Sequence, residues 1–123
     1  MRRPGFTLIE LLVSLAIIAL LLSLVGPRYF SNVTRAEETT LKHNLATLRD
    51  AIDKHYADSG KYPAALADLV QKKYIRTLPV DPVTQSTSTW VLVPPEDPQK
   101  GGVFNVKSGA PGYARDGTPY GEW

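Results

Sequence analysis

The residue with the most unusual chemistry is Glu10, a carboxylate inside an otherwise apolar run from Phe6 to Val25. In a helix these 20 residues cover the roughly 30 Å hydrocarbon core of a bilayer. A charged carboxylate near the bilayer centre costs about 2.5 to 3.5 kcal/mol on insertion scales. A helix that only anchors a domain gains nothing from this acid, so Glu10 predicts a function beyond anchoring.

Cleavage between Gly5 and Phe6 would give Glu10 a partner. The preceding segment, MRRPG, is basic and ends in glycine, and it meets the apolar run at a sharp boundary that a membrane protease could recognise. The new ammonium group on Phe6 would lie about one helical turn from Glu10. In the free subunit the acid would be protonated or poorly paired, whereas a neighbouring cation in a helix bundle would relieve the penalty and select the correct register.

Two simpler explanations for residues 1–27 are weaker. A signal peptide has an apolar core of about 7 to 15 residues before a small-x-small cleavage site, whereas this run is longer and is followed by Gly26-Pro27-Arg28. A plain transmembrane anchor fits in length, and Arg2 and Arg3 would keep its N-terminus in the cytoplasm. The anchor alone leaves Glu10 unexplained.

The composition restricts what the rest of the chain can be. The 123 residues include 14 basic and 12 acidic side chains without a run of like charge, which argues against nucleic-acid binding. The absence of cysteine excludes disulfides, thiol catalysis and cysteine-ligated metals. Beyond the membrane segment the remaining length is typical of one small domain.

The long helix is predicted to continue past the membrane segment. Gly26 and Pro27 end the apolar run, and Pro27 removes a main-chain hydrogen bond, so we expect the helix to break, kink or loosen there. Apolar side chains then recur at intervals of three and four to about Ala57, which predicts a core-facing stripe, with subunit packing an equal alternative for residues 29–33. Asp58-Ser59-Gly60 predicts the helix end. The stripe comprises Phe30, Val33, Leu41, Leu45, Leu48, Ile52 and His55 or Tyr56.

The residues after Gly60 are predicted to form a small sheet that packs against this helix. We expect a short helix over 65–72 and an extended connection over 73–82, where Pro79 and Pro82 exclude helix and central strand. Strands are predicted over 87–93 and 103–107, with Gly101-Gly102 as the turn signal before the second. The fold class is therefore α+β, a long N-terminal helix packed on a small antiparallel sheet.

The segment Gly5-Phe6-Thr7-Leu8-Ile9-Glu10, with the apolar helix behind it, resembles the N-terminal signature of type IV pilins and of the pseudopilins of type II secretion. The resemblance implies that a prepilin peptidase cleaves after Gly5 and methylates the amine of Phe6. It also implies that Glu10 recognises the Phe6 amine of a neighbouring subunit during assembly. Gly26-Pro27 matches the place where such helices kink or unwind on assembly.

Over most of its length the chain is similar to the major pseudopilins, through the order GKYP, short helix, LPVDP, two strands and a glycine-rich end. This implies a cleaved leader (1–5), a transmembrane and assembly helix (6–27) and a periplasmic pilin-like domain (28–123). The implied location is the bacterial inner membrane, with the N-terminus in the cytoplasm. The implied partners are further copies of the chain, minor pseudopilins, the prepilin peptidase and an inner-membrane assembly platform.

In this family the C-terminal loop commonly binds calcium, which implies Ser108, Asp116 and Glu122 as candidate ligands. Calcium takes six to eight oxygen ligands, usually with several carboxylates, and residues 108–123 contain only two acids. Pro111 stands where the family has an acid, and Arg115 adds a positive charge beside Asp116.

A second explanation for the loop needs no metal. Asp116 would cap a turn or pair with a basic neighbour, and aromatic rings would pin the loop by burial. The rings are those of Tyr113, Tyr120 and Trp123.

Catalysis is not predicted, because His43 and His55 lie too far apart for a helical zinc motif and no phosphate loop or nucleophile elbow is present. The leading interpretation is a structural subunit of a periplasmic pseudopilus whose growth, driven by a cytoplasmic ATPase, exports folded proteins. A type IV pilin or minor pilin for adhesion, motility or DNA uptake is the first alternative. An anchored periplasmic binding domain that never polymerises is the second.

Overall fold

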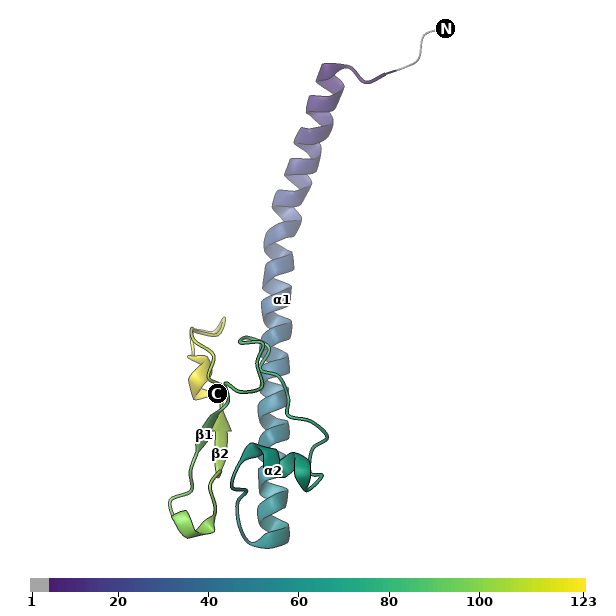
Figure 1. Ribbon diagram of the computed structural model, residues 1–123. Helices are drawn as coiled ribbons and strands as arrows, with labels where there is room; N and C mark the ends of the chain where they lie inside the picture. The colour runs from purple at the N-terminus through teal and green to yellow at the C-terminus, as the bar shows by residue number, and fades with distance from the viewer. Residues whose placement is uncertain (1–4) are drawn as a thin grey trace. The chain divides into compact units, whose positions relative to one another are not determined.

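The computed structural model describes residues 5–123, and the side chains of Phe30 and Ser31 lie outside that description. The expectations that concern Arg2, Arg3 and the rest of residues 1–4 therefore fall outside the described residues. The elements are the helices α1 (Leu8–Ser59) and α2 (Leu66–Gln71), the strands β1 (Val91–Val93) and β2 (Asn105–Lys107), and two short 3-10 turns, Pro98–Lys100 and Tyr120–Glu122 (Figure 1). The contacts divide the chain into two compact units, Met1–Thr34 and Arg35–Trp123.

The helix α1 is not broken at Gly26 and Pro27, which both lie in its interior. The expected break is therefore wrong for the isolated chain. Proline removes a single main-chain hydrogen bond, and the long regular segments on both sides keep the helix continuous. Unwinding on assembly stays a prediction.

Within the second unit, the predicted apolar stripe of α1 is the core. Leu41, Leu45, Leu48 and Ile52 are almost fully buried, and Ala51 joins them. They pack with α2 through Leu69 and with the sheet through Val106, as expected for α+β packing. In Figure 1, α2 and the two strands lie beside the C-terminal half of α1.

The helix α1 ends where the sequence predicts, at Ser59. Gly60 has a φ of 73° and donates its N–H to the carbonyl oxygen of Tyr56 at 2.8 Å, so it is the left-handed residue that stops the helix. His55 is buried at this end and its Nδ1 lies 2.7 Å from the Lys61 carbonyl oxygen. The ring thus ties the helix end to the following loop, as an ordinary structural histidine.

The sheet is antiparallel, as predicted, with Val91 opposite Lys107 and Val93 opposite Asn105. Both strands are shorter than expected. Residues 87–90 stay outside β1. Ser88 and Thr89 bond locally through their hydroxyls, to Ser86 at 2.9 Å and to Thr84 at 2.7 Å, and the Trp90 indole N–H donates to the Pro79 carbonyl oxygen. Val103 instead donates its N–H to the Pro63 carbonyl oxygen at 2.9 Å, which draws it away from the ladder.

A buried acid organises the connection before the sheet. Asp81 is 0% exposed, and its carboxylate accepts from the Val83 N–H at 2.9 Å and from the Ser108 hydroxyl at 2.6 Å. A buried carboxylate is tolerated only when hydrogen bonds replace its hydration. Asp81 therefore fastens the loop after Pro79 to the start of the C-terminal segment.

Candidate functional site

The first candidate site is the start of α1, where Thr7 and Glu10 cap the helix. The Glu10 N–H donates to the Thr7 hydroxyl oxygen at 3.2 Å, and the Thr7 N–H donates to the Glu10 carboxylate at 2.9 Å. Because α1 begins at Leu8, these residues occupy the N-cap and N3 positions of a capping box. Two main-chain donors that would otherwise lack partners are thereby satisfied.

This capping box gives Glu10 a partner within its own chain, and the expectation of a protonated or poorly paired acid in the membrane-inserted subunit stays a prediction. The carboxylate is exposed, yet it already accepts a main-chain hydrogen bond within its own chain. The capping box could have been predicted from the sequence, since Thr7-x-x-Glu10 before an apolar run is the capping-box pattern. A neighbouring cation would therefore exchange with, or add to, an existing partner rather than meet a bare charge.

The predicted cleavage site lies open beside Glu10. Phe6 is 87% exposed, and a Cβ built on Gly5 would have no atom within 4 Å. Phe6 and Glu10 line one shallow hollow together with Ile9, Val13 and Ser14. The backbone nitrogen that cleavage would convert to an amine is therefore carried by a residue that shares a surface with the carboxylate.

The rest of this first unit presents an apolar surface. In the part of the chain that the structure describes, α1 is the one helix long and apolar enough to cross a membrane, and no residue of its most apolar window is buried. Its hydroxyls bond along the helix itself: Ser14 donates to the Glu10 carbonyl oxygen and Ser23 to that of Leu20, both at 2.8 Å. Such a surface requires lipid or other helices around it.

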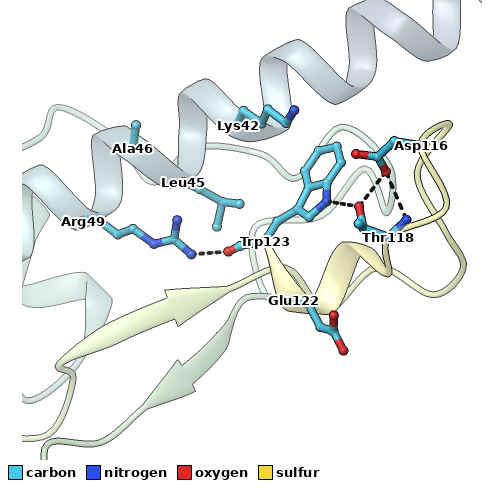
Figure 2. A pocket seen from close by; sticks show the side chains of 8 residues that line it. All are labelled: Lys42, Leu45, Ala46, Arg49, Asp116, Thr118, Glu122 and Trp123. Carbon is cyan, nitrogen blue, oxygen red and sulfur yellow. Dashed lines mark hydrogen bonds between the residues drawn. The ribbon is translucent and has the colours of Figure 1, made fainter.

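The second candidate site is the C-terminal segment, where the predicted calcium ligands do not gather. Ser108 is 2% exposed and donates its hydroxyl hydrogen bond to Asp81. Asp116 accepts from both the N–H (3.0 Å) and the hydroxyl (2.6 Å) of Thr118, so it caps a turn, as the second explanation predicted. Figure 2 shows the Glu122 carboxylate pointing away from Asp116. Within residues 5–123 no group of three or more His, Cys, Asp or Glu side chains is placed to hold a metal ion.

The aromatic rings of this segment differ in burial. Tyr120 is buried and meets the Trp123 ring edge to face, with the centroids 5.1 Å apart. Tyr113 is 71% exposed, so the expectation that it pins the loop is wrong. Its backbone forms an isolated bridge with Pro119.

Charged residues of α1 that the sequence analysis did not single out contact this segment (Figure 2). Arg49 donates to Asn105 Oδ1 and to the Val106 carbonyl oxygen, both at 2.9 Å, and also to the backbone oxygen of Trp123. The Lys42 ammonium lies 4.6 Å from the centre of the Trp123 ring. In the sequence, Lys42 and Arg49 are seven residues apart, which places them on one face of a helix. This spacing is the one sequence signal for a surface that they share.

Comparison with known proteins agrees with the N-terminal geometry. A family described as the prokaryotic N-terminal methylation motif matches residues 1–26. Type II secretion system core protein G of Dickeya chrysanthemi is 29% identical over 96% of this chain and 81% of the relative. The protein of the same name from Klebsiella pneumoniae is 33% identical over 66% of this chain and 69% of the relative. Fimbrial protein EcpC of Eikenella corrodens is 32% identical over 63% of this chain and 54% of the relative.

No solved structure matches the chain significantly. The methylation motif, the apolar helix and the α+β domain behind it define a pilin-like protein. The chain belongs to the family of type II secretion system core protein G, the major pseudopilins.

Proposed function

We propose that this protein is a structural subunit that polymerises through α1 into a periplasmic pseudopilus of a type II secretion system. Growth of that filament would drive export of folded proteins. The observation that carries the proposal is the N-terminal half of α1, an exposed apolar helix at whose start Phe6 shares a hollow with Glu10. Family membership supports the same role.

In this proposal the precursor is anchored in the inner membrane, with its N-terminus in the cytoplasm and its domain in the periplasm. A prepilin peptidase removes residues 1–5 and methylates the new amine of Phe6. Glu10 of one subunit then binds the Phe6 amine of its neighbour. An ion pair inside a helix bundle is stable only when both charges find partners, so a subunit in the wrong register would carry an uncompensated charge.

The proposed partners are further copies of this chain, minor pseudopilins and the inner-membrane assembly platform, with a cytoplasmic ATPase as the energy source. The role is structural, without catalysis. A second candidate function, a type IV pilin or minor pilin for adhesion, motility or DNA uptake, is favoured by the fimbrial relative from Eikenella corrodens. An anchored binding domain that never polymerises would leave the exposed N-terminal motif without a use.

Intact mass of the membrane-extracted protein, from cells with and without a prepilin peptidase, tests the first step. We expect the mass to fall by MRRPG and to rise by one methyl group only when the peptidase is present. A full-length mass in both strains would contradict processing and would leave a plain membrane anchor.

Filament assembly tests the role of Glu10. We expect Glu10→Ala to insert into the membrane at the wild-type level but to form no sheared filaments, because the neighbouring amine then lacks its carboxylate. Ser23→Ala is the matched control, since its hydroxyl donates to the Leu20 carbonyl oxygen of its own helix and it is not among the residues that line the hollow of Phe6 and Glu10, so its loss should leave filament yield unchanged. Filaments from Glu10→Ala in wild-type amount would refute the proposed pairing.

A further inference from the structure

The C-terminal segment 108–123 is attached to the helix that runs beside it. Two attachments come from side chains on α1, one from Glu38 and one from the pair Lys42 and Arg49. A third comes from Asp81, which binds Ser108 at the start of the segment.

Glu38 makes the attachment nearest the middle of the segment. Its carboxylate accepts the Arg115 N–H at 2.8 Å and the Tyr120 hydroxyl at 3.3 Å. A carboxylate that accepts main-chain N–H groups makes a stronger bond than a neutral acceptor does. Glu38 therefore fixes the loop on both sides of its turn, at Arg115 and at the buried Tyr120.

Lys42 and Arg49 hold the end of the segment through Trp123. Lys42 lies over the indole ring, and Arg49 donates to the backbone oxygen of the same residue. The indole N–H donates to the Thr118 hydroxyl at 2.8 Å, which in turn donates to Asp116. One chain of contacts thus leads from α1 through Trp123 to the acid that would have to bind a metal.

The electrostatics of this surface oppose a divalent cation. Lys42 and Arg49 line the same hollow as Asp116 and Glu122, so the hollow holds as many positive as negative side chains (Figure 2). One carboxylate oxygen of Asp116, Oδ1, already accepts two hydrogen bonds from Thr118, whereas calcium needs several free oxygen ligands.

We propose that α1 fastens the C-terminal segment directly, through Glu38, Lys42 and Arg49, in place of the calcium ion that the family resemblance implies. The folded domain then neither binds nor requires calcium. The ligand set does not fit the metal, because the Ser108 hydroxyl is committed to Asp81, Oδ1 of Asp116 is committed to Thr118, and the Glu122 carboxylate points away from Asp116 (Figure 2).

Thermal unfolding of the full chain in detergent, followed by the fluorescence of Trp90 and Trp123, tests whether the domain binds calcium. The probe is calcium chloride, compared with the same protein in EDTA. We expect the same unfolding temperature in both. Calcium at about 100 times its dissociation constant would raise that temperature by about 10 °C or more in a domain of this size, and such a rise would overturn the proposal.

Limited trypsin digestion tests the attachment itself. We expect Glu38→Ala to speed cleavage after Arg115 by about tenfold, because the loop opens more often once its charged acceptor is gone. The control is Glu37→Ala, which removes the same charge from a residue that, in the described part of the chain, makes no hydrogen bond to the loop. Equal cleavage in the two variants would refute the attachment.

Neither measurement depends on filament formation. Failure of this inference would leave processing at Gly5 and assembly through Glu10 untouched. Failure of the pilin role would equally leave the calcium result intact, so the two conclusions can be separated.

Discussion

Several acidic side chains in this protein accept hydrogen bonds from main-chain N–H groups. Glu10 caps α1, Asp81 holds a buried loop and Glu38 reaches a segment that lies 77 residues away in the chain. A carboxylate bonded in this way fixes a turn without needing a cation. In the C-terminal segment Asp116 follows the same rule, since it accepts the Thr118 N–H and caps its own turn.

Tyr120 makes the domain sensitive to alkaline pH. Burial raises the pKa of its hydroxyl, and the negative charge of Glu38 and the hydrogen bond to it act in the same direction. Because the folded-state pKa lies above the ordinary value of 10.0, this group stabilises the fold at lower pH, and the stabilisation is lost as pH rises through the folded-state pKa. We therefore expect the unfolding temperature to fall more steeply above pH 10 in wild type than in Tyr120→Phe.

The control for this pH series is Tyr113→Phe, whose ring is exposed and outside the core. It should follow the wild-type curve. Tyr74, whose pKa the Asp58 carboxylate raises through a hydrogen bond, is present in every protein of the series and cancels in the comparison. If the unfolding temperature fell equally steeply with pH in wild type and in Tyr120→Phe, Tyr120 would not be the source of the alkaline sensitivity.

At the residue scale, sequence could predict Glu10 but not Glu38 or Arg49. Glu10 is conspicuous because an acid in an apolar run is costly when that run lies in a membrane. Glu38 and Arg49 are ordinary charges on an amphipathic helix, and their partners are decided by tertiary packing of segments more than 50 residues away. No local pattern carries that information.

At the element scale, the helices followed from sequence better than the strands did. The stripe from Leu41 to Ile52 repeats at helical spacing and is buried as expected, and Gly60 ends the helix. The strands shortened because competing bonds lie outside the sheet, such as that from the Val103 N–H to Pro63. Periodicity predicts which face is buried but not which acceptor a given N–H will find.

The backbone at Gly109, where the C-terminal segment leaves the sheet, lies close to the backbone of Thr89. A Cβ added to Gly109 would overlap the Thr89 carbonyl oxygen, which is main chain and cannot rotate away. We expect Gly109→Ala to lower the free energy of unfolding by about 1 to 3 kcal/mol, the cost typical of overpacking. Urea unfolding of the variant, read by tryptophan fluorescence, measures this loss.

Gly121→Ala is the matched control in the same segment. Its added Cβ would come no closer than 3.7 Å to the Ser108 carbonyl oxygen, an ordinary contact distance. The unfolding midpoint of this variant should stay near that of wild type. A midpoint for Gly109→Ala as high as that of the control would mean that the backbone can separate at Thr89 without cost.

At the scale of the whole molecule, the two units have different sources of stability. Every member of the buried core lies between Leu41 and Tyr120, inside the second unit. The first unit has its apolar side chains exposed from Phe6 to Val25. Its partners must therefore come from lipid or from other subunits.

Removal of residues 1–34 tests this division. Because the core needs none of them, we expect residues 35–123 to remain folded and soluble and to unfold in one urea transition, at the midpoint of the full chain in detergent. The free energy of unfolding should fall by about 1 to 3 kcal/mol per molar urea, which is typical of a small domain. The fragment should stay monomeric in sedimentation, since it lacks Glu10 and the apolar helix. If it were unfolded, the membrane half of α1 would have to contribute to the fold as well as to assembly.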